Sequence, residues 1–203
     1  MNTVGILALQ GDFEAHCKAV ERAGARSLEV RTAAELTPCD ALIIPGGEST
    51  TMMKLLDEER MTGAIRNFGA VKPIYGSCAG AILLASEVTR PAQASLGLMD
   101  ISVERNAYGR QIDSRIARVS LPRGEDRGEE GVEGDAEMEV VFIRAPIIRR
   151  VGSEARVLAT YAGDPVWVEQ GRHMVTTFHP ELSADRRVHR RLLEKVSSGK
   201  GLF

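Results

Sequence analysis

The chain has 203 residues, a length that favours one full-sized domain over two. Hydrophobic residues make up 43% and charged residues 27% of it, so it can bury a core and global disorder is excluded. The net charge of -2 argues against binding to nucleic acid or an anionic membrane, and three scattered cysteines argue against a disulfide framework and a thiolate zinc site. The N-terminal apolar run ends at Gln10-Gly11-Asp12, too short for a signal sequence or a membrane span, so we expect a soluble cytoplasmic protein.

The first half of the chain alternates short apolar runs with helical patterns. The run at 3–9 predicts a buried strand, and Asp12 is placed to cap a helix that begins at Phe13. Strands are also predicted at 27–30, 41–44 and 73–75, with helices after the turn at 45–47, at 61–68 and after the GSCAG turn. Residues 49–51 are candidate caps of the second helix. These repeated units predict an α/β fold whose mainly parallel sheet carries its site at the carboxyl ends of the strands.

Strand patterns dominate the second half of the chain. They occur at 96–105, 115–121, 139–145, 156–162, 165–170 and 173–179, before an amphipathic helix from about Asp185 to Lys195. Residues 122–139 differ, because four glycines and eight acidic residues leave few apolar anchors. We interpret them as a mobile acidic surface loop of a single domain that spans residues 1–203, the alternative being an acidic docking element.

The most specific local feature is Gly76-Ser77-Cys78-Ala79-Gly80, between a predicted strand and a predicted helix. This G-x-C-x-G pattern indicates a nucleophile elbow, a tight turn that projects its central side chain out of the sheet. A helix that starts at Ala79 directs its free N–H groups at the sulfur and stabilises a thiolate. We therefore predict that Cys78 is a nucleophile and that the N–H of Ala79 is one oxyanion donor; the alternative is a small buried cysteine in a turn.

A second oxyanion donor is expected from the loop Pro45-Gly46-Gly47-Glu48-Ser49, which also follows a strand. Gly47 has no Cβ, so it allows close approach of an intermediate and rotation of its own peptide. The loop lacks the Gly-Lys-Ser/Thr ending of a phosphate loop, and taken alone it is more readily interpreted as an ordinary glycine turn.

His179 is the candidate base. It follows an apolar strand in the sequence His179-Pro180-Glu181, where an open α/β sheet collects its site residues. Residues two apart in an extended segment project to the same side, so Glu181 can orient the imidazole. The alternative is a histidine at a strand end with an unrelated exposed glutamate.

The other three histidines give weaker signals. His16 falls inside the first helix, His173 begins a strand and His189 lies in the basic C-terminal helix, and we expect each to be structural or solvated. No Cys or His shares ligand spacing with Cys78 or His179, so neither a metal nor another cofactor is predicted.

Six motifs follow one another along the chain: LALQGDFEAH, LIIPGGESTTM, YGSCAG, VERNAYGRQ, FIRAP and FHPEL. Together they closely resemble the glutaminase subunits of pyridoxal 5′-phosphate synthase, which belong to the class I (triad) glutamine amidotransferases. The resemblance runs nearly end to end and implies a flavodoxin-like three-layer αβα domain with a mixed, mainly parallel central sheet. The long acidic segment departs from the family pattern, as does Ser77 where threonine is usual.

The resemblance implies a role for each residue of the elbow and of the late motif. Cys78 is the nucleophile, His179 the general base and acid, and Glu181 the orienting carboxylate. Gly47 and Ala79 would supply the amides of the oxyanion hole.

The resemblance also implies the substrate, L-glutamine, which is hydrolysed to L-glutamate and ammonia through a thioester on Cys78. The positions that match the family's glutamine-binding residues are Gly47, Glu48, Ser49, Arg105, Ile143 and Arg144. The forked guanidinium of Arg105 suits a carboxylate, whereas Ile143 would contribute only backbone groups. Without the resemblance, the favoured interpretation of Arg105 and Arg144 is that they form surface salt bridges.

A partner protein is implied as well. The family pairs this subunit with a (β/α)₈-barrel pyridoxal 5′-phosphate synthase subunit that uses the ammonia, and Gln10 matches a segment near the active site and that interface. Two alternatives remain: a cysteine peptidase or other acyl hydrolase on the same fold, and a non-catalytic assembly subunit. The motifs PGGEST and RNAYGRQ argue against the first, and the presence of all three triad residues argues against the second.

Overall fold

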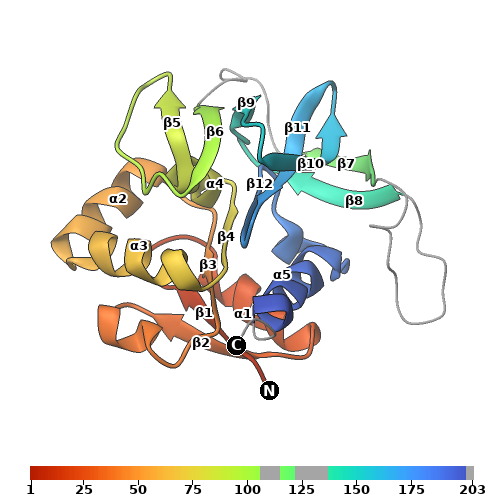
Figure 1. Ribbon diagram of the computed structural model, residues 1–203. Helices are drawn as coiled ribbons and strands as arrows, with labels where there is room; N and C mark the ends of the chain where they lie inside the picture. The colour runs from red at the N-terminus through yellow and green to blue at the C-terminus, as the bar shows by residue number, and fades with distance from the viewer. Residues whose placement is uncertain (106–114, 122–136, 200–203) are drawn as a thin grey trace.

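A seven-stranded sheet forms the centre of the computed structural model, which describes residues 1–105, 115–121 and 137–199 (Figure 1). Its strand order is β10-β11-β12-β4-β3-β1-β2. The bounds are β1 Thr3–Leu7, β2 Arg26–Val30, β3 Ala41–Ile44, β4 Ile74–Ser77, β10 Ala155–Tyr161, β11 Asp164–Gln170 and β12 His173–Thr176. Strands β12, β4, β3, β1 and β2 are parallel, and β11 and β10 add an antiparallel edge. The predicted mixed, mainly parallel sheet is confirmed.

Helices cover both faces of this sheet. They are α1 Phe13–Arg22, α2 Ser49–Glu58, α3 Met61–Val71, α4 Ala79–Leu84 and α5 Arg187–Gly199. Helices α1 and α5 pack on one face and α2, α3 and α4 on the other, which makes three layers (Figure 1). Among the helices of the described ranges, none is long and apolar enough to cross a membrane.

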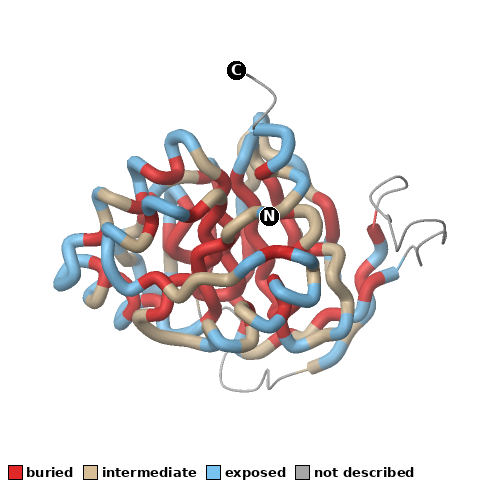
Figure 2. The backbone as a smooth tube through the Cα atoms, turned by 90° about the horizontal axis from the view of Figure 1, so that it is seen from below, coloured by how far each residue is buried: buried red, intermediate tan, exposed pale blue. Residues whose placement is uncertain are grey.

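Strand β3 shows how the sequence builds the two cores. All four of its side chains are buried, and successive residues point to opposite faces. Ala41 and Ile43 join the core under α1 and α5, while Leu42 and Ile44 join the core under α2 and α3. A continuous apolar run is therefore required at a central strand covered on both sides. Figure 2 shows buried residues concentrated in the interior of the molecule and exposed residues at its periphery.

Two smaller sheets extend the domain beyond the carboxyl ends of the parallel strands. One contains β5 Ala85–Thr89, β6 Met99–Glu104 and β9 Ile147–Val151, and the other pairs β7 Arg115–Ser120 with β8 Glu137–Phe142. The sequence predicts neither β5 nor β9. Helix α4 ends earlier than its apolar run suggests, because Ala85 adopts an extended conformation and pairs with Met99.

The predicted acidic loop at 122–139 is only partly within the described residues. Residues 122–136 lie outside them. Residues 137–139 form the start of β8 instead of a loop, because buried Met138 alternates with exposed Glu137 and Glu139 in the two-residue period of a strand.

Candidate active site

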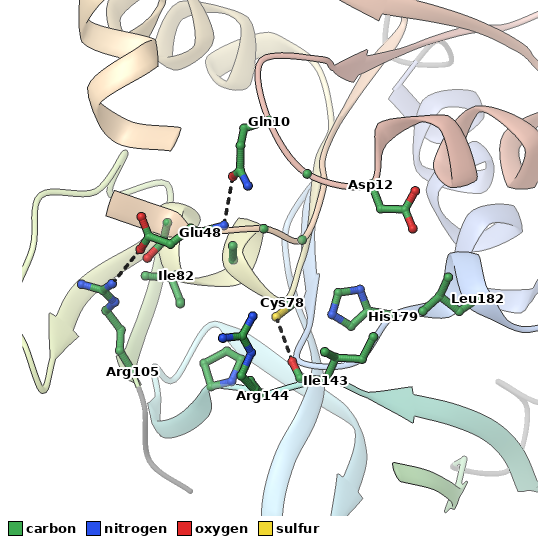
Figure 3. Close-up of a pocket in the computed structure, with 16 residues that line it drawn as sticks. Gln10, Asp12, Glu48, Cys78, Ile82, Arg105, Ile143, Arg144, His179 and Leu182 are labelled. Atoms are coloured by element: carbon green, nitrogen blue, oxygen red, sulfur yellow. Dashed lines mark hydrogen bonds and ion pairs between the residues drawn. The ribbon is translucent and has the colours of Figure 1, made fainter. Parts of the chain in front are cut away.

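The carboxyl ends of four neighbouring parallel strands meet at one pocket. Strand β1 leads to Gln10, β3 to Gly46 and Gly47, β4 to Cys78, and β12 to His179. The pocket has a volume of about 370 Å³ and opens between these loops (Figure 3). The site therefore lies where an open α/β sheet is expected to carry it.

Cys78 occupies a strained turn between β4 and α4. Its backbone adopts φ 48° and ψ -101°, outside the regions that most residues populate. Its N–H donates a 2.8 Å hydrogen bond to the Thr176 carbonyl, which ties the turn to β12. A Cβ on Gly80 would collide with the carbonyl of Ile44, so glycine is needed for the helix to start this close to β3. The strand, turn and helix occur where the sequence predicts them.

His179 lies beside Cys78, and Glu181 is hydrogen-bonded to its ring on the side away from the sulfur. The Nδ1 atom of His179 is 2.7 Å from Oε1 of Glu181, and the glutamate side chain is fully buried. The ring packs against Gly46, where a Cβ would leave no room for the imidazole. Figure 3 shows the imidazole next to the sulfur, so the structure brings together the three residues predicted as a triad.

The charges of this group follow from its partners. Burial alone would lower the pKa of His179, but the neighbouring Cys78 sulfur and the hydrogen-bonded Glu181 carboxylate raise the pKa to about 10. Burial alone would raise the pKa of Glu181, but the imidazoles of His16 and His179 lower it. At neutral pH the arrangement thus holds an imidazolium between the sulfur and an ionised carboxylate.

Glu48 and Arg105 form an ion pair at the other end of the pocket. An Nη2 atom of Arg105 lies 3.2 Å from Oε1 of Glu48 and donates a 2.9 Å hydrogen bond to Oγ1 of Thr50 (Figure 3). Burial would raise the pKa of Glu48, but hydrogen bonds from Thr51 and Thr50 lower it to about 2. These bonds make Glu48 the N-cap of α2, and the prediction that residues 49–51 cap this helix is wrong.

The remaining predicted glutamine-binding residues also line the pocket. The Ile143 carbonyl faces the sulfur of Cys78 at 3.8 Å, so Ile143 presents a backbone group, as expected. Arg144 has a positive φ of 44° and its side chain lies along the pocket beside Cys78 (Figure 3). Ser49 is buried and donates a 3.0 Å hydrogen bond to Oε1 of Gln93.

Gln10 contacts the loop that follows β3. Its Oε1 accepts a 2.9 Å hydrogen bond from the N–H of Glu48. A Cβ on Gly47 would come within 2.5 Å of the same oxygen, so the Gln10 amide packs directly on Gly47. Both predicted members of the oxyanion hole, Gly47 and Ala79, line the pocket.

Several residues of the site were not predicted. The pocket also contains Gly11, Asp12, Ile82, Pro146 and Leu182. His16, predicted as structural or solvated, is fully buried and lies 3.2 Å from Oε2 of Glu181. Its helical spacing from Phe13 and Val20 signals burial, but nothing local signals its contact with Glu181.

The side chains of the described residues do not indicate a metal site. Among residues 1–105, 115–121 and 137–199, no group of three or more His, Cys, Asp or Glu side chains could hold a metal ion. Cys17, Cys39 and Cys78 are free thiols, and burial raises the pKa of both Cys17 and Cys39.

Comparison with known sequences identifies one family. The sequence model of the SNO glutamine amidotransferase family matches residues 6–198. The pyridoxal 5′-phosphate synthase subunit PdxT of Solibacter usitatus is 57% identical over 197 residues, which cover 97% of this chain and 100% of the relative. The subunit of the same name from Koribacter versatilis is 48% identical over 198 residues, covering 97% of this chain and 96% of that one.

Solved structures give a consistent result. A crystal structure of a glutamine amidotransferase superposes with a TM-score of 0.84 at 42% identity and covers 96% of this chain and 98% of that chain. A glutamine amidotransferase from Thermotoga maritima superposes with a TM-score of 0.56 at 15% identity, covering 98% of this chain and 85% of that chain, and shows similarity of fold alone.

Proposed function

Because the chain belongs to the SNO glutamine amidotransferase family, we propose that it hydrolyses L-glutamine to L-glutamate and ammonia through a thioester on Cys78. The observation that carries this proposal is the elbow conformation of Cys78 beside a His179–Glu181 pair 2.7 Å apart in a pocket at the strand ends. Nucleophile, acid-base residue and orienting carboxylate are the parts that acyl transfer needs.

In the first half-reaction, Cys78 attacks the side-chain amide carbon of glutamine as a thiolate, its thiol proton having passed to His179. Negative charge develops on the carbonyl oxygen, and the N–H groups of Gly47 and Ala79 are the candidates to stabilise it. The imidazolium of His179 gives its proton to the departing nitrogen as the carbon–nitrogen bond breaks. Ammonia leaves, and the γ-glutamyl group remains on Cys78 as a thioester.

In the second half-reaction, the neutral imidazole of His179 takes a proton from water as the oxygen attacks the thioester carbon. A second oxyanion forms in the same place, the carbon–sulfur bond breaks, and glutamate leaves. Glu181 stabilises the imidazolium that is regenerated, which returns the site to its starting state.

Recognition of free glutamine requires partners for its α-carboxylate and α-ammonium groups. Arg105 supplies a guanidinium and Glu48 a carboxylate at the end of the pocket away from Cys78, and they pair with each other at 3.2 Å. In this arrangement the guanidinium can bind the α-carboxylate of glutamine and the carboxylate can bind its α-ammonium group. Gly47, Ser49, Ile143 and Arg144 complete the proposed glutamine-binding set.

The product suggests a partner. Ammonia released into water is protonated and lost as a nucleophile, and relatives at 57% and 48% identity are named subunits of pyridoxal 5′-phosphate synthase. We propose that the chain delivers ammonia to a (β/α)₈-barrel synthase subunit, and that contact with it at Gln10 sets the orientation of the Gly47 peptide. A fully active isolated chain would contradict this dependence.

The test measures ammonia release from glutamine by the wild type, Cys78→Ala and Cys17→Ala, each with and without a synthase barrel. We expect activity with the barrel, background activity for Cys78→Ala, and wild-type activity for Cys17→Ala, since Cys17 is a free thiol outside the pocket. Mass spectrometry after treatment with an electrophilic glutamine analogue should place the adduct on Cys78. No activity with a competent barrel, or activity that survives Cys78→Ala, would reject the mechanism.

A further inference from the structure

A second imidazole lies behind the triad. His16 of α1 is fully buried, and its Nε2 atom lies 2.9 Å from Oγ of Ser77 and 3.2 Å from Oε2 of Glu181. Ser77 directly precedes Cys78 at the end of β4, and Glu181 binds His179 through its other oxygen. One side chain of α1 therefore contacts both of the segments that carry the nucleophile and its base.

His189 of α5 fixes the opposite side of this imidazole. Its Nε2 atom is 3.2 Å from Nδ1 of His16, and both rings pack edge-on against Tyr75, with centroids 6.0 and 6.3 Å away. The Tyr75 hydroxyl is 2.7 Å from Oγ1 of Thr176. The cluster thus joins α1, α5, β4 and β12 beneath the elbow and restricts the orientation of the His16 ring.

Glu181 needs a second hydrogen-bond donor. Its side chain is 0% exposed, Oε1 is bound by His179, and Oε2 has no hydrogen bond of good geometry within the described ranges. A buried carboxylate oxygen without a donor is costly. Burial lowers the pKa of His16 and outweighs the neighbouring charge of Glu181, which raises it. A neutral imidazole has one N–H to donate, so His16 can serve Glu181 as a donor without bringing a second positive charge to the carboxylate.

We infer that His16 is a positioning residue of the glutaminase, whose Nε2–H holds Glu181 in the orientation that aligns His179. The inference rests on the proposed function, since it concerns the same triad. A carboxylate can only accept, so the nitrogen that faces Glu181 carries the proton and Nδ1 accepts from His189. The same nitrogen is hydrogen-bonded to Oγ of Ser77 at 2.9 Å and lies 3.2 Å from Oε2 of Glu181, so a small rotation of the ring exchanges one acceptor for the other and couples the elbow to the base.

The test compares His16→Gln with His16→Leu in the assembled complex. In His16→Gln the new side-chain amide reaches about as far as Nε2 does in the wild type, whereas in His16→Leu the space is filled without a donor. We expect His16→Leu to lower kcat about 10- to 100-fold, the size of effect found for groups that orient metal-binding histidines, with KM for glutamine within about twofold. His16→Gln should recover most of the lost kcat.

A second readout does not depend on glutamine. Alkylation of Cys78 by iodoacetamide, located by mass spectrometry, reports how well His179 is aligned with the sulfur. We expect slower alkylation at pH 7 in His16→Leu and a rate near wild type in His16→Gln. If His16→Leu fails to fold, His16→Asn replaces it, because its amide is one bond shorter and does not reach Glu181.

The matched control is His173→Leu, which removes another buried histidine at the opposite end of β12 from His179. We expect it to lower the melting temperature without changing kcat. Equal kcat in wild type and His16→Leu, equal losses in His16→Gln and His16→Leu, or a loss confined to KM would overturn the inference. The proposed function fails by a different result, namely no Cys78-dependent ammonia release by the wild type itself.

Discussion

The side-chain oxygen of Gln10 accepts a 2.9 Å hydrogen bond from the main-chain N–H of Glu48, and the same amide packs on Gly47. Gln10 follows β1 and the glycine loop follows β3, and these two strands are paired neighbours. A single side chain at the mouth of the pocket therefore fixes the direction of peptides that lie beside Cys78 (Figure 3).

Replacing Gln10 by methionine tests this contact. The change removes the acceptor for the Glu48 N–H but keeps a side chain of similar length over Gly47. Loss of a hydrogen bond of about 1 kcal/mol predicts a fall in kcat of about fivefold, measured with the synthase barrel present. The melting temperature should change little, because Gln10 lies at the rim of the pocket. Wild-type kcat in Gln10→Met would contradict the proposed role of the contact.

Replacing Glu181 by glutamine should remove the negative charge that stabilises the protonated form of His179, the proposed base. The variant keeps the shape but removes the charge that helps to raise the pKa of His179 to about 10, so that pKa should fall toward 6.5. Glutaminase activity should drop by about 10³- to 10⁴-fold, as when the acid of a triad is neutralised. A variant within about tenfold of wild type would show that Glu181 has no such part.

The protonation change can be measured directly by NMR of the histidine rings. Burial lowers the pKa of the other three histidines: that of His173 to about 4, that of His189 to about 3, and that of His16 as well. His179 should therefore be the one histidine ring that titrates well above pH 6.5. In Glu181→Gln this high titration should move down. If the high-pH titration of His179 were the same in Glu181→Gln as in the wild type, Glu181 would not be the cause of the raised pKa of His179.

Gly80 should be irreplaceable for steric reasons. In Gly80→Ala the new methyl group meets the carbonyl of Ile44, and a backbone group cannot move aside cheaply. We expect a loss of about 2–4 kcal/mol in the free energy of unfolding, measured by urea denaturation. Gly63→Ala in α3 is the matched control, since among the described residues no atom beyond the neighbouring backbone of its own helix lies within 4 Å of the added Cβ. It should stabilise the protein by about 0.5–1 kcal/mol. Similar effects of the two changes would refute the steric explanation.

Acid should destabilise the protein through its buried neutral histidines. Burial, chiefly, holds the pKa of His173 at about 4 against 6.5 when unfolded, so its contribution is complete above pH 6.5 and is lost as pH falls toward 4. The loss is about 1.4 kcal/mol per pH unit in that window. In His173→Asn the amide can still accept the Ile74 N–H, which the ring accepts at 3.2 Å, but it does not titrate.

Denaturation at pH 7 and pH 5 measures this difference. Wild type should lose about 2 kcal/mol more than His173→Asn between the two values. Equal losses in the two proteins would show that His173 does not titrate as expected. His179 acts in the opposite direction, because its raised pKa makes its contribution complete below pH 6.5 and removes it as pH rises toward 10.

Local sequence patterns predict those helices, strands and turns that are determined by residues close to one another in the sequence. The strand at 41–44 is found with the predicted bounds, and Asp12 caps α1 by accepting from the N–H of Ala15. The elbow at Cys78 is equally local, because small residues flank a turn between a strand and a helix. Such features depend on neighbours within a few positions.

Distant contacts explain what sequence patterns miss. Ser and Thr are the usual capping residues, but Glu48 takes that position in α2 and pairs with Arg105 from another part of the chain. The spacing of His16 indicates burial only, whereas its contact is with Glu181, which comes much later in the sequence. Both contacts exist only once the sheet has assembled, so a local pattern contains no sign of them.

The register of β12 against β4 sets when the proposed nucleophile, Cys78, meets its proposed base during synthesis of the chain. Thr176 lies opposite Ser77 in this parallel pair, which brings His179, just after β12, next to Cys78, just after β4. A ribosome makes Cys78 about a hundred codons before His179. The proposed chemistry of Cys78 therefore requires β12, so the site is complete only when this late strand has joined the parallel sheet.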